Sequence, residues 1–280
     1  MPDQDFETFR QSVITSENPS TIIQVVSFDV FDTLLKRSFL NQENTWKAVS
    51  QQFYTCRRLA EIFARRLNLK FQSQEVTLSD IYRFMPKRFL SDSEFSFEKK
   101  SIRIDSLIDS LIAYLLEKNI EVFLVSDTYY SSRQIYSLLE GVSFDRDKIK
   151  IICSSEFGCT KSQKLFSIIK NNFSLNYTNW THIGDNLEAD YQIPNKLGIK
   201  CFLYENSINA FLKSKILSKK GINKWIVYRG PQNLYEFIDE FQDFSSNSAV
   251  SILDSLSTQL LSPIIKTLVL QIDRSERERN

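Results

Sequence analysis

Five short apolar runs, each followed by polar residues, have the length and pattern of buried strands. They lie at Ile22–Phe28, Glu121–Val125, Ile149–Cys153, Trp180–Ile183 and Ile199–Tyr204. Between and after the later runs, apolar residues recur at helical spacing, at Ile135–Leu139, Lys161–Ile169, Ala189–Leu197 and Ile208–Leu217. Strands that alternate with helices form parallel sheets covered on both faces. The pattern predicts an α/β fold with a Rossmann-like parallel sheet sandwiched by helices.

The interval between the first and second strands is far longer than a single crossover helix requires. Apolar residues at three- and four-residue steps from Trp46 to Leu67 predict one long amphipathic helix. A shorter helix is expected at Leu78–Met85, and a third at Phe95–Lys118. We expect these helices to form a cap, residues 38–116, inserted into a core made of residues 1–37 and 117–244.

The C-terminal part has a different pattern from the core. Residues 245–280 carry an apolar stripe at helical spacing from Leu253 to Ile272, interrupted by Pro263. We expect a helical C-terminal extension. Such a stripe either packs back on the core or docks a partner subunit or further domains.

Composition narrows the class of protein. Apolar residues make up 42% and charged residues 25%, as in soluble globular chains. The net charge of +1 lacks the positive excess of nucleic-acid-binding domains. We therefore interpret the pairs Arg57–Arg58 and Arg65–Arg66 as the solvated face of a cap helix. No apolar run approaches the ~18 residues of a membrane span, and no signal-peptide pattern is present, so a cytoplasmic protein is expected.

The single histidine, His182, lies within a predicted strand, where we expect it to pack or to bond locally. Carboxylates, hydroxyls and a lysine must therefore carry any chemistry. Asp29 and Asp32 follow the first strand, Ser126 and Asp127 follow the second, and Asp185 follows the fourth. Ligands of open parallel sheets bind outside the carboxyl ends of the strands, so these side chains are expected to converge.

Lys161 follows the third predicted strand. Thr160 and Gln163 form a capping-box pattern, which would place Lys161 in the first turn of a helix. A lysine beside the free N–H groups of a helix start suits an anion, phosphate above all. Carboxylates nearby would repel that anion unless a hard cation lies between them. Mg²⁺, which takes oxygen ligands, fits this requirement.

Four segments resemble the four motifs of the haloacid dehalogenase-like (HAD) superfamily, in the same order. VVSFDVFDTLL resembles the first motif, FLVSDTYY the second, Lys161 the third and HIGDNLEAD the fourth. The resemblance covers roughly residues 20–210. More narrowly, FDVFDTLL and SDTYYSSRQIYSLL resemble predicted HAD hydrolases that occur alone or fused to glycosyltransferases in surface-polysaccharide systems. That narrower resemblance implies a sugar phosphate as substrate.

The resemblance implies a role for each matching residue. Asp29 would be the nucleophile that forms an aspartyl-phosphate, and Mg²⁺ would be held by Asp29, the backbone carbonyl of Phe31 and Asp185. The remaining residues divide by role: Ser126, Asp127, Lys161 and Asn186 would bind phosphate or substrate, Ser126, Lys161 and Asp32 would assist catalysis, and Thr33 and Asp190 would orient the site.

One position departs from the superfamily pattern. HAD phosphatases usually carry a second Asp two residues after the nucleophile, which acts as general acid and base, whereas this chain has Phe31 there. Such catalysis contributes ~10² to 10⁴ in rate. Three explanations are open: Asp32 or a cap residue substitutes, the substrate has a good leaving group, or turnover is slow or absent. Dehalogenases also carry an aromatic residue here, but they need no metal, and the acidic GDNLEAD segment would then have no role.

These observations predict a Mg²⁺-dependent phosphohydrolase of a small phosphorylated metabolite, with no nucleic-acid partner. Two alternatives remain open. The first is a weak or inactive HAD-like domain that binds phosphate and Mg²⁺ and docks partner domains. The second is a phosphotransferase, which passes the phosphoryl group to an acceptor other than water.

Overall fold

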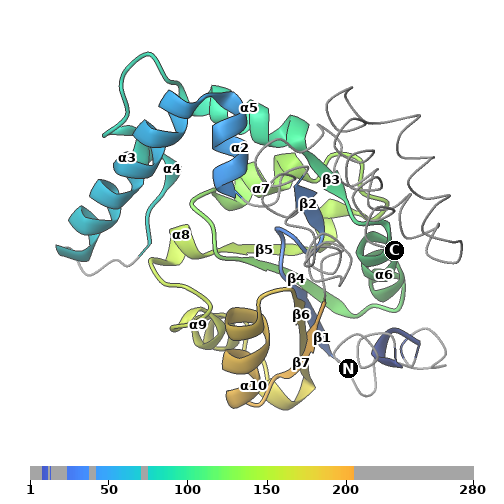
Figure 1. The fold of residues 1–280 in the computed structure, drawn as a ribbon. Coiled ribbons are helices and arrows are strands. Elements are labelled where there is room, and N and C mark those ends of the chain that lie inside the picture. The colour runs from blue at the N-terminus through green and yellow to red at the C-terminus, as the bar shows by residue number, and fades with distance from the viewer. Residues whose placement is uncertain (1–7, 12, 14–23, 38–41, 71–74, 205–280) are drawn as a thin grey trace, which may run out of the picture. The chain divides into compact units, whose positions relative to one another are not determined.

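The computed structural model describes residues 8–11, 13, 24–37, 42–70 and 75–204. Within these residues, a parallel sheet of five strands has the order β5–β4–β1–β6–β7 (Figure 1). Its strands are β1 (Val25–Phe28), β4 (Glu121–Ser126), β5 (Lys150–Cys153), β6 (Trp180–Gly184) and β7 (Lys200–Leu203). Each strand falls within or closely overlaps one of the five predicted runs, so the predicted Rossmann-like α/β fold is confirmed.

The central strands bury both faces of the sheet because successive side chains point to opposite sides. Val26 and Phe28 pack into the apolar layer that includes α6 (Ser106–Glu117) and α7 (Ser132–Leu138). Val25 packs into the opposite layer with α9 (Leu165–Asn172), and Leu197, which follows α10 (Ile193–Lys196), packs against the same layer. Helices therefore cover both faces of the sheet.

The register of the central strands brings three strand ends to one level. Phe28 at the end of β1 is paired with Leu124 of β4 and with Ile183 of β6. All three strands run parallel, so the residues that follow them emerge at the same edge. This edge is where Asp29, Ser126 and Asp185 meet.

The long interval between β1 and β4 folds differently from its sequence pattern in two respects. The single helix predicted from Trp46 to Leu67 is wrong: α2 (Gln42–Val49) ends before Ser50, and α3 (Gln51–Lys70) begins after it. The Ser50 hydroxyl accepts a hydrogen bond from the Phe53 backbone N–H at 3.0 Å, which satisfies one of the free donors of a new helix start. Ala60 and Ala64 of α3 face inward, whereas Phe63 and Leu67 are exposed.

The helix predicted at Phe95–Lys118 is also wrong, because two helices flank a short strand. After α4 (Leu78–Tyr82), α5 (Ser91–Ser101) leads into β3 (Ile102–Ile104), which pairs antiparallel with β2 (Leu35–Arg37). Asp105 then caps α6, since its carboxylate accepts from the N–H groups of Leu107 and Ile108 at 3.0 and 3.1 Å. Helix α6 contacts β4 of the main sheet. The division into core and cap stays a prediction.

Two expectations fall on other parts of the chain. The helix at Ile208–Leu217 and the helical extension of residues 245–280 lie outside the described residues. Among the residues that are described, no helix has both the length and the apolar character needed to cross a membrane.

Candidate active site

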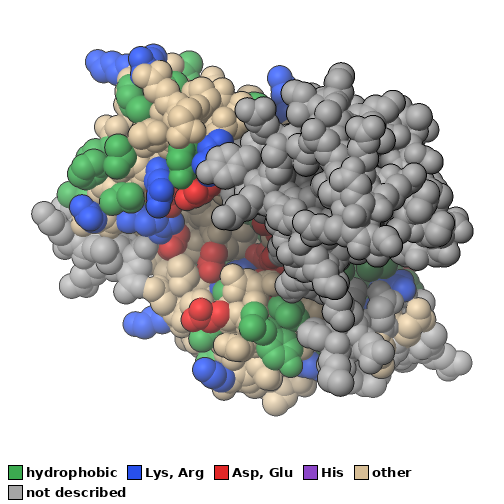
Figure 2. Space-filling model, in the orientation of Figure 1, with side chains coloured by type: hydrophobic (Ala, Val, Ile, Leu, Met, Phe, Trp, Pro, Cys, Tyr) green, Lys and Arg blue, Asp and Glu red, His purple; other side chains and the backbone are tan. Residues whose placement is uncertain are grey.

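A cavity of about 410 Å³ lies at the carboxyl ends of the strands, and helices α2 and α3 contribute side chains to its far wall. Figure 2 shows Asp and Glu side chains gathered in this hollow. Every site residue predicted from the sequence lines the cavity except Thr33. The Thr33 hydroxyl lies behind the lining, where it donates to Asp29 Oδ2 at 3.4 Å.

Lys161 is held between two carboxylates at the floor of the cavity. Its Nζ lies 2.6 Å from Asp29 Oδ1 and 2.5 Å from Asp190 Oδ1, and the side chain is only 3% exposed. Burial by itself would lower the pKa of this ammonium group, but the two carboxylates raise the pKa above its usual range. The group is therefore a fixed positive charge beside Asp29.

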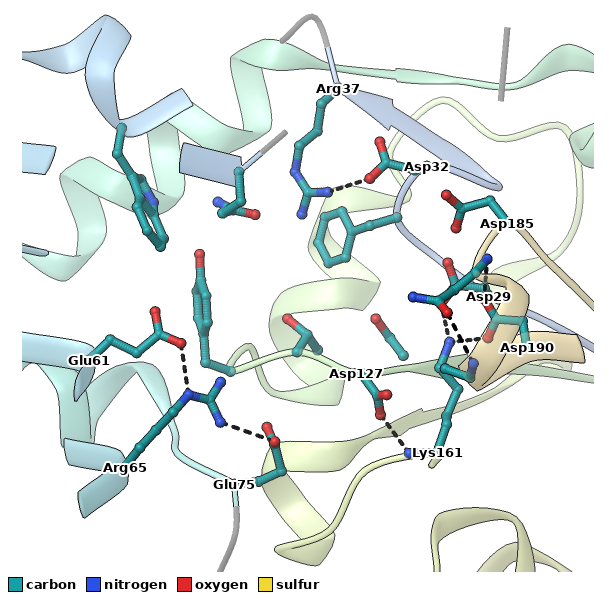
Figure 3. Close-up of a pocket in the computed structure, with 18 residues that line it drawn as sticks. Asp29, Asp32, Arg37, Glu61, Arg65, Glu75, Asp127, Lys161, Asp185 and Asp190 are labelled. Atoms are coloured by element: carbon teal, nitrogen blue, oxygen red, sulfur yellow. Dashed lines mark hydrogen bonds and ion pairs between the residues drawn. The ribbon is translucent and has the colours of Figure 1, made fainter. Parts of the chain in front are cut away.

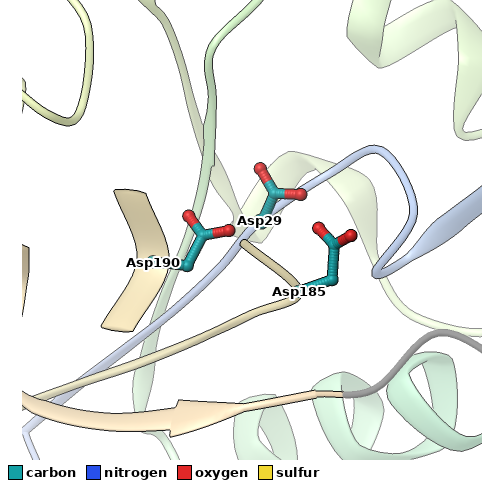
Figure 4. Close-up of side chains that lie close together, drawn as sticks. All are labelled: Asp29, Asp185 and Asp190. Atoms are coloured by element: carbon teal, nitrogen blue, oxygen red, sulfur yellow. The ribbon is translucent and has the colours of Figure 1, made fainter. Parts of the chain in front are cut away.

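Asp29, Asp185 and Asp190 form a carboxylate cluster (Figure 4). One oxygen from each lies within 4.8 Å of the others. Burial raises the pKa of Asp29 well above its usual value despite the nearby ammonium. Burial and the charges of Asp32 and Asp190 raise the pKa of Asp185 to about 7. Carboxylate oxygens that repel one another in a desolvated site are suited to a hard divalent cation, so the donor set fits Mg²⁺.

Asp190 is the most firmly held member of this cluster. It lies in η4 (Leu187–Gln192), a π-helical turn, a form of helix that is frequent at functional sites. Its Oδ2 accepts from the Asn186 backbone N–H at 3.0 Å, and its Oδ1 contacts His182 Nε2 at 3.1 Å as well as Lys161. Burial raises the pKa of Asp190, but Lys161 and His182 outweigh burial and hold the pKa below its usual range. Asp190 is therefore an ionised anchor for Lys161.

A chain of buried polar groups supports Asp190 from inside the sheet. His182 is fully buried, and burial lowers its pKa, so the ring is neutral. An ionised Asp190 only accepts hydrogen bonds, so His182 Nε2 carries the ring proton and Nδ1 accepts from Ser27 Oγ at 2.7 Å. Trp180 Nε1 donates to the same Ser27 oxygen at 2.7 Å. These hydrogen bonds thus orient the Asp190 carboxylate through neutral side chains.

The link from Ser27 through His182 to Asp190 was not predicted from the sequence. The available signal was strand periodicity: Trp180 and His182 lie two residues apart on β6 and share a face. Ser27 joins them because β1 pairs with β6 in the register that sets Ser27 against His182. That register is a property of the folded sheet.

The backbone around Lys161 differs from the predicted helix start. Lys161 does not lie in the first turn of a helix, since residues 161–164 form a turn and α9 begins at Leu165. The Lys161 N–H donates instead to Asp127 Oδ1 at 2.8 Å. That donor is satisfied within the chain, so the predicted anion site at a helix start is not formed by this group. Ser126, at the end of β4, is buried and lines the cavity.

No family model and no curated protein matches the chain. Among solved structures, it is similar to a HAD family enzyme from Bacteroides thetaiotaomicron in complex with magnesium and inorganic phosphate. The TM-score is 0.50 at 16% identity, over 66% of this chain and 95% of that one. The described part of the chain has the HAD fold.

Two further structures show weaker similarity. A predicted HAD-like family hydrolase from Porphyromonas gingivalis gives a TM-score of 0.49 at 16% identity, over 69% of this chain and 100% of that one. A 2-haloacid dehalogenase from Pseudomonas syringae gives 0.40 at 14% identity, over 63% of this chain and 84% of that one. The narrower resemblance to hydrolases associated with glycosyltransferases stays a prediction.

In this HAD fold, the first motif contains the residue that departs from the phosphatase pattern. The guanidinium carbon of Arg37 lies 4.0 Å from the centroid of the Phe31 ring, and Phe31 is 8% exposed. Asp32 has a φ of +64°, in the left-handed region that non-glycine residues seldom adopt. This backbone places the Asp32 carboxylate in the cavity, 3.1 Å from Arg37 Nη1. Asp32 is thus present but paired with an arginine.

Asn186 has a local structural task in addition to lining the cavity. Its Oδ1 accepts from the backbone N–H groups of Glu188 and Ala189, both at 3.0 Å, and so caps η4. The cap sets the start of the turn that carries Asp190. Whether Asn186 also contacts substrate stays a prediction.

The far wall of the cavity contains a network of ion pairs (Figure 3). The interpretation of the arginine pairs as a solvated face is wrong for Arg57, whereas Arg58 and Arg66 are exposed. Arg65 donates from Nε to Glu61 at 2.9 Å and from Nη1 to Glu75 at 3.1 Å. Arg57 is fully buried, within 4.4 Å of the Trp46 ring centroid and paired with Glu94 at 2.9 Å. Because both arginines pair with carboxylates on other segments, helical spacing alone reveals neither the burial of Arg57 nor the pairing of Arg65 with Glu75.

Proposed function

We propose that this protein is a Mg²⁺-dependent phosphohydrolase that acts on a small phosphorylated metabolite through an aspartyl-phosphate intermediate. The observation that carries the proposal is the setting of Asp29. This carboxylate is buried at the end of the central strand, beside the Asp185 carboxylate and 2.6 Å from a lysine ammonium. The solved HAD family enzyme of similar fold was obtained with magnesium and inorganic phosphate, which supports the same ligand chemistry here.

The proposed reaction has two displacements at phosphorus. Asp29 attacks the phosphorus atom, and the bond to the leaving oxygen breaks as that oxygen takes up a proton from solvent. Water then attacks the same phosphorus and gives up a proton to solvent, the bond to Asp29 breaks, and inorganic phosphate and free Asp29 result. Phosphoryl transfer depends mainly on positioning and on neutralising charge. Lys161 and, as predicted, Ser126 hold the phosphoryl oxygens during both steps.

Asp29, Asp185 and the backbone carbonyl of Phe31 would hold the magnesium ion. When bound, the ion supplies charge neutralisation for the phosphoryl oxygens. Asp190 is less available as a ligand, because it already bonds Lys161, His182 and the Asn186 backbone. We assign it the task of orienting Lys161.

Phe31 and Asp32 of the first motif indicate which leaving groups should react fastest. Phe31 has no proton to donate, and Asp32 is paired with Arg37. Burial raises the pKa of Asp32, although Arg37 lowers it in part. We therefore expect substrates with good leaving groups, such as aryl phosphates, to react faster than simple alkyl phosphates. Asp32 is the nearest candidate in the sequence for the missing acid.

Release of phosphate from an aryl phosphate, with and without Mg²⁺, tests the proposal. We expect metal-dependent turnover that is lost in Asp29→Asn, a variant that removes a buried negative charge and should still fold. Asp92→Asn, an exposed aspartate on α5, is the matched control and should keep full activity. Turnover that does not need Mg²⁺, or that survives in Asp29→Asn, would overturn the mechanism.

Trapping with beryllofluoride separates the proposed enzyme from the alternatives. This ion mimics a phosphoryl group on aspartate, so it should raise the melting temperature of the wild type in Mg²⁺ but not that of Asp29→Asn. Binding without any turnover would favour the binding domain. Turnover that rises on addition of an alcohol acceptor, with phosphate passed to the alcohol, would favour the phosphotransferase.

A further inference from the structure

We propose that the outer face of α3 attaches this protein to an anionic lipid bilayer. The α3 stripe consists of Leu59, Phe63 and Leu67, which follow one another at steps of four residues, with Ile62 beside them. Residues three and four apart on a helix are neighbours on one face, so the stripe is continuous. This inference goes beyond the proposed function and does not depend on it.

The side chains of the α3 stripe are apolar and yet exposed. The exposed fractions of Leu59, Phe63 and Leu67 are 51%, 52% and 37%, and Ile62 is likewise exposed. Phe84, two residues after α4, is exposed as well and extends the stripe, because its ring centroid lies 6.1 Å from that of Phe63. Single exposed apolar residues are common, but a contiguous group of them marks an interaction site.

The α3 stripe faces away from the cavity. Two residues along an α-helix are separated by roughly 200° about its axis, so Glu61 and Arg65, which line the cavity, lie on a different side of α3 from Phe63. In Figure 1, α3 lies at the margin of the described elements, packed against α2 and α4. A partner bound to the stripe would therefore leave the lining of the cavity untouched.

Basic side chains surround the stripe. The sequence of α3 holds five basic residues and one acidic residue, although the net charge of the whole chain is only +1. Figure 2 shows hydrophobic and basic side chains together over α3 and α4. The exposed members of this basic set beside the stripe are Arg58, Arg66 and Arg83.

These arginines are little neutralised by the protein itself. Arg58 lies 3.8 Å from Glu43, and Arg83 lies 3.4 Å from Asp80. Exposed ion pairs of this kind contribute little free energy. Arg66 forms no ion pair with any of the described residues. The charge that complements this surface is therefore negative.

An anionic bilayer matches the surface better than a peptide or a nucleic acid does. A partner helix binds in a groove that encloses its apolar face, whereas the stripe projects from a single helix. A nucleic acid would meet the arginines with phosphates but would leave the apolar stripe in water. At a bilayer surface, Phe and Leu side chains enter the boundary of the acyl chains while arginines on the same helix reach the anionic headgroups.

Co-flotation of the full chain with lipid vesicles tests the inference. One set of vesicles contains phosphatidylcholine alone, and the other also contains phosphatidylglycerol, which is anionic. We expect partition into the anionic vesicles to exceed partition into the neutral ones by about tenfold or more at low salt. The difference should shrink at high salt, because exposed charges are then screened.

Variants of the stripe and of its basic border should both weaken binding. Phe63→Ser removes an apolar anchor and should lower partition into anionic vesicles by about tenfold. Arg66→Glu should lower it by about tenfold or more. If Phe63→Ser melts early, Leu59→Ser makes the same test. Leu187→Ser on η4 and Arg133→Glu on α7 are the matched controls, exposed outside the stripe, and should bind as the wild type does.

Equal partition into the two kinds of vesicle would overturn the inference. Vesicle binding that Phe63→Ser and Arg66→Glu leave unchanged would also overturn it, because the lipid contact would then lie elsewhere in the chain. Protein that ignores vesicles but binds polyglutamate would assign the stripe to an acidic protein instead. Protein that ignores vesicles but forms a dimer, lost in Phe63→Ser, would assign it to a second copy, and either result would overturn the inference.

Discussion

Gly184, the last residue of β6, leaves the space that Asp190 occupies. A Cβ atom at this position would lie 2.5 Å from Asp190 Cγ, 2.5 Å from Oδ2 and 2.6 Å from Cβ. Carbon atoms that are not bonded approach to about 3.5 Å, so Gly184→Ala must displace the Asp190 side chain by about 1 Å. The displaced carboxylate would lose its alignment with Lys161 and His182, which it contacts at 2.5 and 3.1 Å.

Two effects, one on folding and one on catalysis, follow from this displacement. Overpacking a well-packed site costs about 1–3 kcal/mol of folding free energy. A misplacement of about 1 Å in a catalytic group costs about 10²-fold in rate. A 10²-fold loss in rate corresponds to about 2.7 kcal/mol, so the two effects are similar in free energy and are separated by measuring kcat and unfolding on the same variant. The protein should remain folded at 25 °C.

Initial rates of aryl phosphate hydrolysis in saturating Mg²⁺, measured beside a urea unfolding curve, test this prediction. Gly141→Ala is the matched control. Gly141 has a φ of +96°, so alanine is strained there, and among the described residues the added Cβ would meet only Ile104, at 3.6 Å and away from the site. This variant should lose stability and keep its kcat. A folded Gly184→Ala with wild-type kcat would refute the assignment of Asp190 as the residue that positions Lys161.

Three further predictions concern the acid, the metal and the cap. Phe31→Asp should raise turnover of alkyl phosphates by about 10²-fold if only a general acid is missing; unchanged rates in a folded variant would count against that account. The metal-free protein should lose stability as pH rises from about 4 to about 7, because the folded state retains a proton on Asp185, whose pKa is raised to about 7. Mg²⁺ should therefore raise the melting temperature more at pH 8 than at pH 5; an equal rise at both values would contradict this. Arg57→Ala should cost about 3–5 kcal/mol in urea unfolding, because the buried Glu94 keeps its hydrogen bonds from Tyr82 and Tyr129 but loses its only cationic partner among the described residues; a loss under 1 kcal/mol would argue against a buried pair.

The sheet and the polar residues at the floor of the cavity could be predicted from local sequence patterns. Each strand is an apolar run that ends in polar residues, and the ends of parallel strands necessarily share one edge. For that reason Asp29, Ser126 and Asp185 could be placed together without any knowledge of distances. The start of α7 is likewise a local feature, because Ser131 and Gln134, three residues apart, form a capping box with hydrogen bonds at 3.3 and 3.0 Å.

The tertiary structure alone decided which polar groups became partners. Strand register set Ser27 against His182 and so completed the support of Asp190. Packing between segments buried Arg57 and joined Arg65 to Glu75, although helical spacing indicated a solvated face. Local pattern reports how a residue relates to its neighbours along the chain. Charge pairing depends on which residues of a distant segment fold close by. The residues at the floor of the cavity could therefore be predicted from the sequence, whereas the ion pairs of its far wall could not.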